Sequence, residues 1–89
     1  MSTKPTRKIE VTVAFAAAER PYRHNYAPQT SIQTVLADAL TKFEITSDGT
    51  TRYYLLHHGD EPALTSTVAE VAGRADSLRL KLRTETIQG

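Results

Sequence analysis

The feature that most constrains the fold is a strict alternation of residue types near the C-terminus. Three leucines alternate there with three basic residues: Leu78, Arg79, Leu80, Lys81, Leu82 and Arg83. A two-residue period places the leucines on one face of a β-strand and the cations on the other. The chain must therefore supply a core for one face of this strand, while its basic face meets water or a partner.

A second alternation begins at Lys8, after residues 1–7, which are polar and show no period. Its apolar members are Ile9, Val11, Val13 and Phe15, and β-branched and aromatic residues of this kind are typical of strands. Tyr22, His24 and Tyr26 resume the alternation, which predicts a hairpin with a loop of about five residues. We expect residues 1–7 to be a flexible leader.

One amphipathic helix is predicted over residues 31–44. Its apolar face is formed by Ile32, Val35, Leu36, Ala39, Leu40 and Phe43, which recur at helical spacing. Thr30 and Gln33 are placed to form a capping box at its start. The turn residues 46–49 that follow predict its end near Phe43 or Glu44.

The remaining elements are a strand over residues 52–58, a short strand or helical turn within 63–73, and the basic strand over 77–83. A hairpin, one helix and a last strand that returns to the same sheet predict an α+β fold, with a mixed four- to five-stranded sheet packed on one helix. This arrangement is the β-grasp. We expect one domain over residues 8–83, followed by a flexible tail over 84–89.

Composition restricts the function. The chain has 89 residues, no cysteine and a formal net charge of 11 − 10 = +1. One small core with no cysteine nucleophile favours a surface-acting protein over an enzyme, and we expect no cofactor. Neither a secretory signal nor an apolar run of about 18 residues is present, so a cytoplasmic location without membrane contact is expected.

The chain resembles ubiquitin and the ubiquitin-like proteins over residues 8–89. The residues that carry the resemblance are Pro28, Ile32, Val35 and Ala37 around the helix start, Leu55, Leu56 and Gly59 in the third strand, Ala63, Leu64, Thr65 and Val68 after it, and the final strand from Ser77 to Arg83. In ubiquitin the helical positions of this set are buried. The resemblance implies the β-grasp fold and a role as a protein modifier.

The family's chemistry implies a role for Gly89. A ubiquitin-like modifier has its C-terminal carboxylate adenylated by an ATP-dependent activating enzyme, transferred to a cysteine as a thioester, and then joined to a target amine. Gly89 is the matching residue, because a residue without a Cβ enters a narrow channel. Ubiquitin's double glycine is replaced here by Thr86 and Ile87, and the chain ends on a single glycine two residues later.

The resemblance also implies a docking surface. Leu56 matches the central isoleucine of ubiquitin's interaction patch, whereas Arg79 and Lys81 replace its histidine and valine. His58 and Arg83 complete the predicted partner-binding set. A partner with acidic residues fits this surface better than an apolar one, since an unpaired buried cation costs several kcal/mol, of order 2 or more.

The implied partners are an activating enzyme, a conjugating enzyme, a processing or deconjugating metalloprotease, and target proteins, as in prokaryotic ubiquitin-like systems. Lys4 and Lys8 are candidate acceptors for a second copy of the modifier. The free protein is expected to be a monomer, and its net charge of +1 disfavours nucleic acid. Two other functions remain open: a non-conjugated adaptor, and a sulfur carrier, which would normally need the missing double glycine.

A metal site at the adjacent histidines His57 and His58 is not expected. Neighbouring residues of a strand point to opposite faces, so the two rings should not ligate one ion. We expect one of the two histidines to be an exposed partner contact instead.

Overall fold

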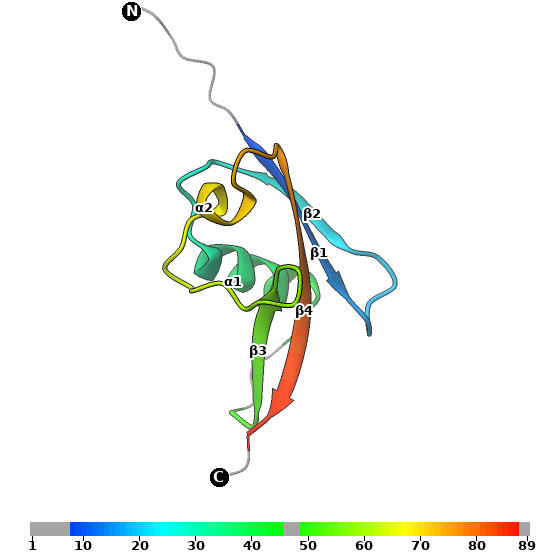
Figure 1. Ribbon diagram of the computed structural model, residues 1–89. Coiled ribbons are helices and arrows are strands. Elements are labelled where there is room, and N and C mark those ends of the chain that lie inside the picture. Colours follow the sequence, from blue (N-terminus) through cyan, green and yellow to red (C-terminus); the bar gives the residue numbers. More distant parts are fainter. Residues whose placement is uncertain (1–7, 46–48, 88–89) are drawn as a thin grey trace, which may run out of the picture.

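The computed structural model describes residues 8–45 and 49–87, which form one sheet with two helices on the same side of it (Figure 1). In chain order the elements are β1 (Ile9–Phe15), β2 (Tyr22–Tyr26), α1 (Ile32–Lys42), β3 (Thr51–Leu56), α2 (Val68–Ala72) and β4 (Ser77–Thr86). Every element predicted from the sequence is present, and the segment predicted as a strand or helical turn is the short helix α2.

The sheet is mixed and has the strand order β2-β1-β4-β3. The hairpin strands β1 and β2 are antiparallel, β1 and β4 are parallel, and β3 is antiparallel to β4. The last strand therefore lies in the middle of the sheet between strands that precede it by tens of residues. This topology, with α1 across one face, is the predicted β-grasp.

The core lies between the helices and one face of the sheet, which we call the inner face. Its members come from every element: Ile9, Val11, Val13, Tyr26, Ile32, Val35, Ala39, Leu55, Val68, Leu78, Leu80 and Leu82. The alternation in β4 is obeyed, because Leu78, Leu80 and Leu82 are at most 2% exposed while the residues between them are exposed. Ala37 is exposed on α1, so the buried position implied by the family resemblance is wrong for this residue.

Helix α1 begins one residue later than the predicted capping box requires. The N-cap is Ser31, whose side chain accepts a hydrogen bond from the Thr34 backbone N–H at 3.2 Å. The Thr30 carbonyl instead accepts from the Val68 N–H at 2.8 Å, which ties the helix start to α2. The predicted Thr30–Gln33 cap is therefore wrong, although the helix boundaries are close to those predicted.

Helix α2 has the capping box that α1 lacks. The Thr67 hydroxyl accepts from the Glu70 N–H at 3.1 Å, and the Glu70 carboxylate accepts from the Thr67 N–H at 2.8 Å. Reciprocal capping of this kind stabilises a helix end that would otherwise leave backbone donors unsatisfied. It allows a helix of only 5 residues to hold Val68 in the core.

Strand β4 continues three residues beyond Arg83, through a segment predicted to be a flexible tail. Residues 84–86 pair with the start of β3, and the Ile87 N–H donates to the Thr50 carbonyl at 2.7 Å. The predicted tail is thus wrong for this segment, since its backbone is held by a neighbouring strand. Neither helix in the described part of the chain is long and apolar enough to span a bilayer.

Candidate functional site

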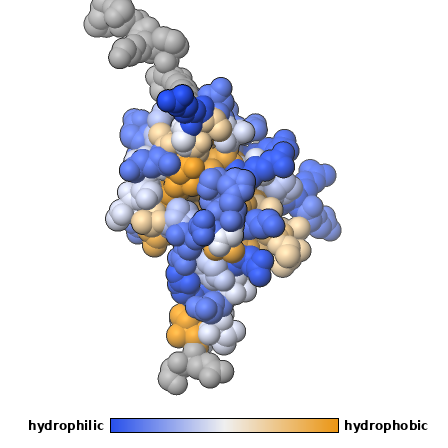
Figure 2. Space-filling model, viewed as in Figure 1, coloured by the Kyte–Doolittle hydropathy of each residue, from blue (hydrophilic) through white to orange (hydrophobic). Residues whose placement is uncertain are grey.

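The face of the sheet opposite the helices, which we call the outer face, carries the predicted docking residues. Arg79, Lys81 and Arg83 are exposed on it, because their leucine neighbours on β4 point into the core. We refer to these three cations as the basic row. Figure 2 shows hydrophilic side chains covering most of the surface seen in that view, with the apolar areas interrupted between them.

A hollow of about 760 Å³ lies on the outer face, lined by residues of all four strands. The five residues predicted to bind partners all line it: Leu56, His58, Arg79, Lys81 and Arg83. The structure therefore brings together residues from two strands and a turn.

Sequence reasoning missed two charged residues of this hollow, Arg23 and Glu10. Arg23 lies on β2 opposite Thr12, whose other neighbour is Arg79 on β4. The two-residue alternation could have predicted the position of Arg23. It lies between Tyr22 and His24, so its side chain must point to the opposite face of the strand from theirs. Adjacent strands are about 4.8 Å apart, so Arg23 and the basic row form one positively charged area.

The charges of this area are not neutralised locally. Within residues 8–45 and 49–87, none of Arg23, Arg79, Lys81 and Arg83 makes an ion pair, and Glu10 carries the one negative charge among the described lining residues. Clustered like charges on a surface create a potential that attracts oppositely charged partners and speeds their encounter. The outer face is thus suited to an acidic partner.

Leu56 is one of the apolar residues that line the hollow, with Ala14, Pro21 and Leu80. It is half-buried at the end of β3 and pairs in register with Lys81. A tight turn follows, closed by hydrogen bonds between His57 and Asp60, of 2.7 Å from the His57 N–H and 3.0 Å from the Asp60 N–H. Gly59, with φ of +85°, adopts a backbone conformation that other residues rarely take.

The two adjacent histidines contact each other, contrary to the prediction that they point to opposite faces. Their ring centroids are 4.2 Å apart, because β3 ends at Leu56 and His58 has a left-handed backbone with φ of 52°. Burial lowers the pKa of His57, His58 adds to this effect and Asp60 opposes it. In the described part of the chain, no group of three or more His, Asp or Glu side chains is placed to bind a metal.

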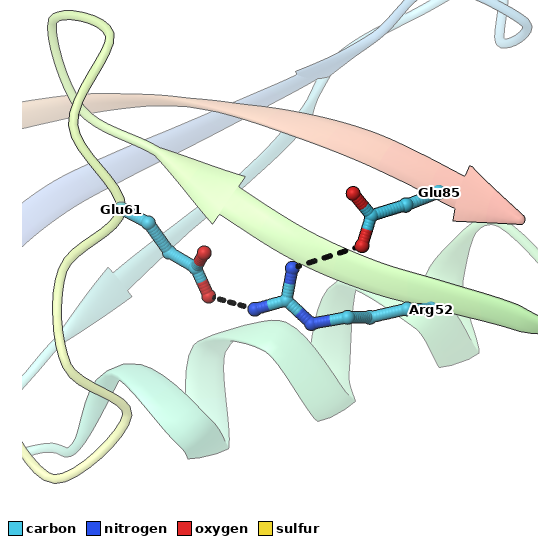
Figure 3. A network of polar contacts seen from close by, with 3 residues as sticks. All are labelled: Arg52, Glu61 and Glu85. Atoms are coloured by element: carbon cyan, nitrogen blue, oxygen red, sulfur yellow. Dashed lines mark hydrogen bonds and ion pairs between the residues drawn. The ribbon is translucent and has the colours of Figure 1, made fainter. Parts of the chain in front are cut away.

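The strand that carries the basic row ends in a small polar network (Figure 3). Arg52 on β3 forms ion pairs with Glu61, from the loop after β3, and with Glu85 near the end of β4, the latter at 3.8 Å. The guanidinium also lies over the Tyr54 ring, 4.7 Å from its centroid. This network links the end of β4 to β3 and to the loop that follows β3.

Two predicted reactive positions, Gly89 and Lys4, lie outside the described residues. Lys8 is exposed and directly precedes β1. Ile87 is the last described residue and is 48% exposed. Strand β4 thus ends three residues before Gly89 in sequence, and the last described residue precedes it by two.

The tyrosines of β2 contribute to packing rather than to an open stacking platform. Tyr26 is 6% exposed and Tyr22 is half-buried, and their hydroxyl oxygens are 2.6 Å apart. His24 stacks with Tyr22 and meets Tyr26 edge-on, with ring centroids 6.2 Å and 4.8 Å away. A buried ring such as that of Tyr26 is not available to stack on a nucleic-acid base.

No protein-family model matches the sequence, and no curated protein matches it. Solved structures do match. A ubiquitin from Caldiarchaeum subterraneum has a TM-score of 0.71 and 23% identity, covering 92% of this chain and 99% of that chain. A structure described as molecular mimicry of SUMO that promotes DNA repair has a TM-score of 0.71 and 12% identity, covering 90% and 95%.

An N-terminal ubiquitin-like domain solved in solution is also similar, with a TM-score of 0.68 and 14% identity, covering 100% of this chain and 88% of that chain. These neighbours share the complete fold and little sequence. The chain therefore has the ubiquitin-like β-grasp fold, and its function has to be argued from the site.

Proposed function

We propose that this protein is a ubiquitin-like modifier that is joined to target proteins through the carboxylate of Gly89. The observation that carries the proposal is the course of β4, which leads from the basic row directly into the segment that ends at Gly89. Docking and chemistry would then be linked by one strand. An enzyme bound to the outer face would have the reactive carboxylate within a few residues of its contact surface.

The chemistry would be supplied by partner enzymes. The Gly89 carboxylate would attack the α-phosphate of ATP and release pyrophosphate, giving an acyl adenylate. A cysteine thiolate of the enzyme would displace AMP to form a thioester, and a target amine would then displace the thiol to form an amide. The modifier would act as a substrate in each step, and its own side chains would only position it.

The outer face would dock these enzymes. Leu56 would provide apolar contact, while His58 and the basic row would meet acidic groups of the activating or conjugating enzyme. Lys8, which is exposed beside β1, and Lys4 would accept a further copy of the modifier. The free protein would be a cytoplasmic monomer, and a metalloprotease would process or release it.

A second candidate is a non-conjugated adaptor that binds partners through the outer face alone. The pairing of residues 84–86 with β3 favours it, because it shortens the stretch of chain that can extend into a channel. Six residues of extended chain from Thr84 would span about 20 Å, whereas three from Ile87 would span about 10 Å. The two functions differ in their need for Gly89.

Mass spectrometry of the protein recovered from its native cells distinguishes these functions. Trypsin cleaves after Arg83, so a conjugate would leave residues 84–89 on the modified lysine as an isopeptide-linked remnant. We expect this remnant on other proteins, and we expect deletion of Gly89 to abolish it. Leu56→Asp should reduce the remnant as well, by weakening docking.

A matched control keeps this test specific. Deletion of Gly89 should leave the fold and the binding of partners to the outer face unchanged, since the residue follows the last described strand. Only free protein in cells in which an activating enzyme and ATP are confirmed would reject the modifier and favour the adaptor.

A further inference from the structure

The spacing of the basic row is regular. Successive cations on one face of a strand are about 6.8 Å apart, twice the rise per residue. Alternate side chains of an extended peptide have the same spacing. A peptide with carboxylates at alternate positions can therefore meet Arg79, Lys81 and Arg83 without bending.

The positive area is short and is bounded by negative charges. Glu10 lies beside Ser77, two residues before Arg79 on the outer face. Glu85 lies two residues beyond Arg83 and is ion-paired with Arg52, in a network with Glu61 whose formal charge is +1 − 2 = −1. A long polyanion such as a nucleic acid would run over these carboxylates at both ends. A short acidic segment fits between them.

The residues beside the basic row define the rest of the partner. Leu56 on β3 is paired with Lys81 and half-buried, so it offers an apolar contact next to the middle cation. Arg23 adds a positive charge on the other side, across Thr12 from Arg79. The partner segment should thus combine several carboxylates with an apolar side chain.

We infer that the outer face binds a short, extended acidic segment of a partner protein, with Asp or Glu at alternate positions and a neighbouring apolar residue that packs on Leu56. This inference deepens the docking part of the proposed function and rests on it. It specifies the chemistry that an activating or conjugating enzyme, or an adaptor's partner, would present. Binding can be measured without any conjugation, so the two proposals can fail separately.

The test uses the full chain and two synthetic peptides of the same composition. One is Glu-Thr-Glu-Thr-Glu-Thr-Leu, with alternating acids and the leucine on the same face as the acids, and the other is Glu-Glu-Glu-Thr-Thr-Thr-Leu, with clustered acids. Titrations followed by amide NMR should show the alternating peptide binding more tightly, with shifts on β4 and around Leu56. Raising the salt from about 0.05 M to about 0.3 M should weaken binding, because exposed charges are screened.

Two variants with the same change of charge provide the control. Lys81→Glu should lower the affinity for the alternating peptide by about tenfold. Lys42→Glu, at the end of α1, should change this affinity less than about twofold. Equal effects of the two variants, equal affinity for the two peptides, or no binding of either peptide would overturn the inference. Tighter binding of single-stranded oligo-dT than of the alternating peptide would also overturn it and indicate a nucleic-acid partner.

Discussion

Tyr26 donates a hydrogen bond to a side-chain oxygen of Asp38 at 2.8 Å, and this bond joins the edge strand β2 to helix α1. Because the Tyr26 proton is given to Asp38, the Tyr22 hydroxyl must donate to the Tyr26 oxygen 2.6 Å away. The network is partly buried. The network connects the hairpin that carries Arg23 to helix α1, which covers the core.

Replacing Tyr26 with phenylalanine should lower the free energy of unfolding by about 1–2 kcal/mol. The change keeps the ring but leaves Asp38 and Tyr22 without their shared partner, and a hydrogen bond to a carboxylate contributes more than a neutral one. Urea denaturation measures the difference. Tyr53→Phe is the matched control, because Tyr53 is half-buried on β3, at the opposite edge of the sheet, and should tolerate the change. Equal losses in the two variants would contradict a specific role for the hydroxyl.

The stability of the protein should fall as the pH rises above about 10. Burial, the hydrogen bond with Tyr22 and the hydrogen bond to Asp38 together raise the pKa of Tyr26 above its ordinary value of 10.0. Above that pH the unfolded chain releases the phenol proton while the folded chain keeps it. The folded state then binds more protons, so the free energy of unfolding decreases with pH.

Denaturation curves between about pH 8 and about pH 11 would measure this decrease. Tyr26→Phe removes the titrating group, so its free energy of unfolding should decrease less steeply with pH. In Tyr53→Phe the free energy of unfolding should decrease with pH as steeply as in the parent protein. A curve that stays as steep in Tyr26→Phe as in the parent protein would assign the effect to other groups.

Much of the fold could be predicted from the sequence because periodicity reports burial directly. The alternation in β1 and β4 and the helical spacing from Ile32 to Phe43 each describe one face against the core, and a core face is decided by the local sequence. The capping box of α2 was also readable, since Thr67 and Glu70 have the required spacing, but no apolar period drew attention to it.

Two of the failures share a cause, which is that strand pairing and turn geometry depend on distant or unusual backbone contacts. Residues 84–86 have no buried face, and they are a strand only because β3 lies beside them. The contact between His57 and His58 follows from a left-handed non-glycine residue that the sequence does not announce. The basic row was predicted to lie on one exposed face because it obeys the two-residue period, and Leu56 was added from the family resemblance. Arg23 was missed although it obeys the same two-residue period.

The turn after Leu56 should depend on the conformation of Gly59 rather than on space around it. A Cβ added at Gly59 would meet no atom within 4 Å, yet φ of +85° is unfavourable for a residue with a side chain. Gly59→Ala should therefore cost about 1 kcal/mol of stability, and Gly59→Asn should cost less because asparagine tolerates the left-handed region. Thermal denaturation of the two variants tests this, and equal losses would point to a lost contact instead of backbone strain.

The Arg52 network should control the end of β4 with little effect on the stability of the whole domain. Arg52, Glu61 and Glu85 have side chains that are 43%, 37% and 62% exposed, and ion pairs this exposed contribute about 0–1 kcal/mol. These ion pairs should matter more for the local stability of residues 84–86, because the side chains of these residues are exposed and the segment depends on pairing with β3.

Arg52→Ala should therefore leave the urea midpoint nearly unchanged while speeding hydrogen exchange at the amides of residues 84–87, as measured by NMR. Exchange from local opening reports the strength of the local contacts, and terminal segments are the first to open. Arg79→Ala is the matched control, since it removes the same side chain from β4 without touching the network. If both variants exchange at the rate of the parent protein, backbone pairing alone holds the strand, and Arg52 does not govern how far the segment leading to Gly89 can extend.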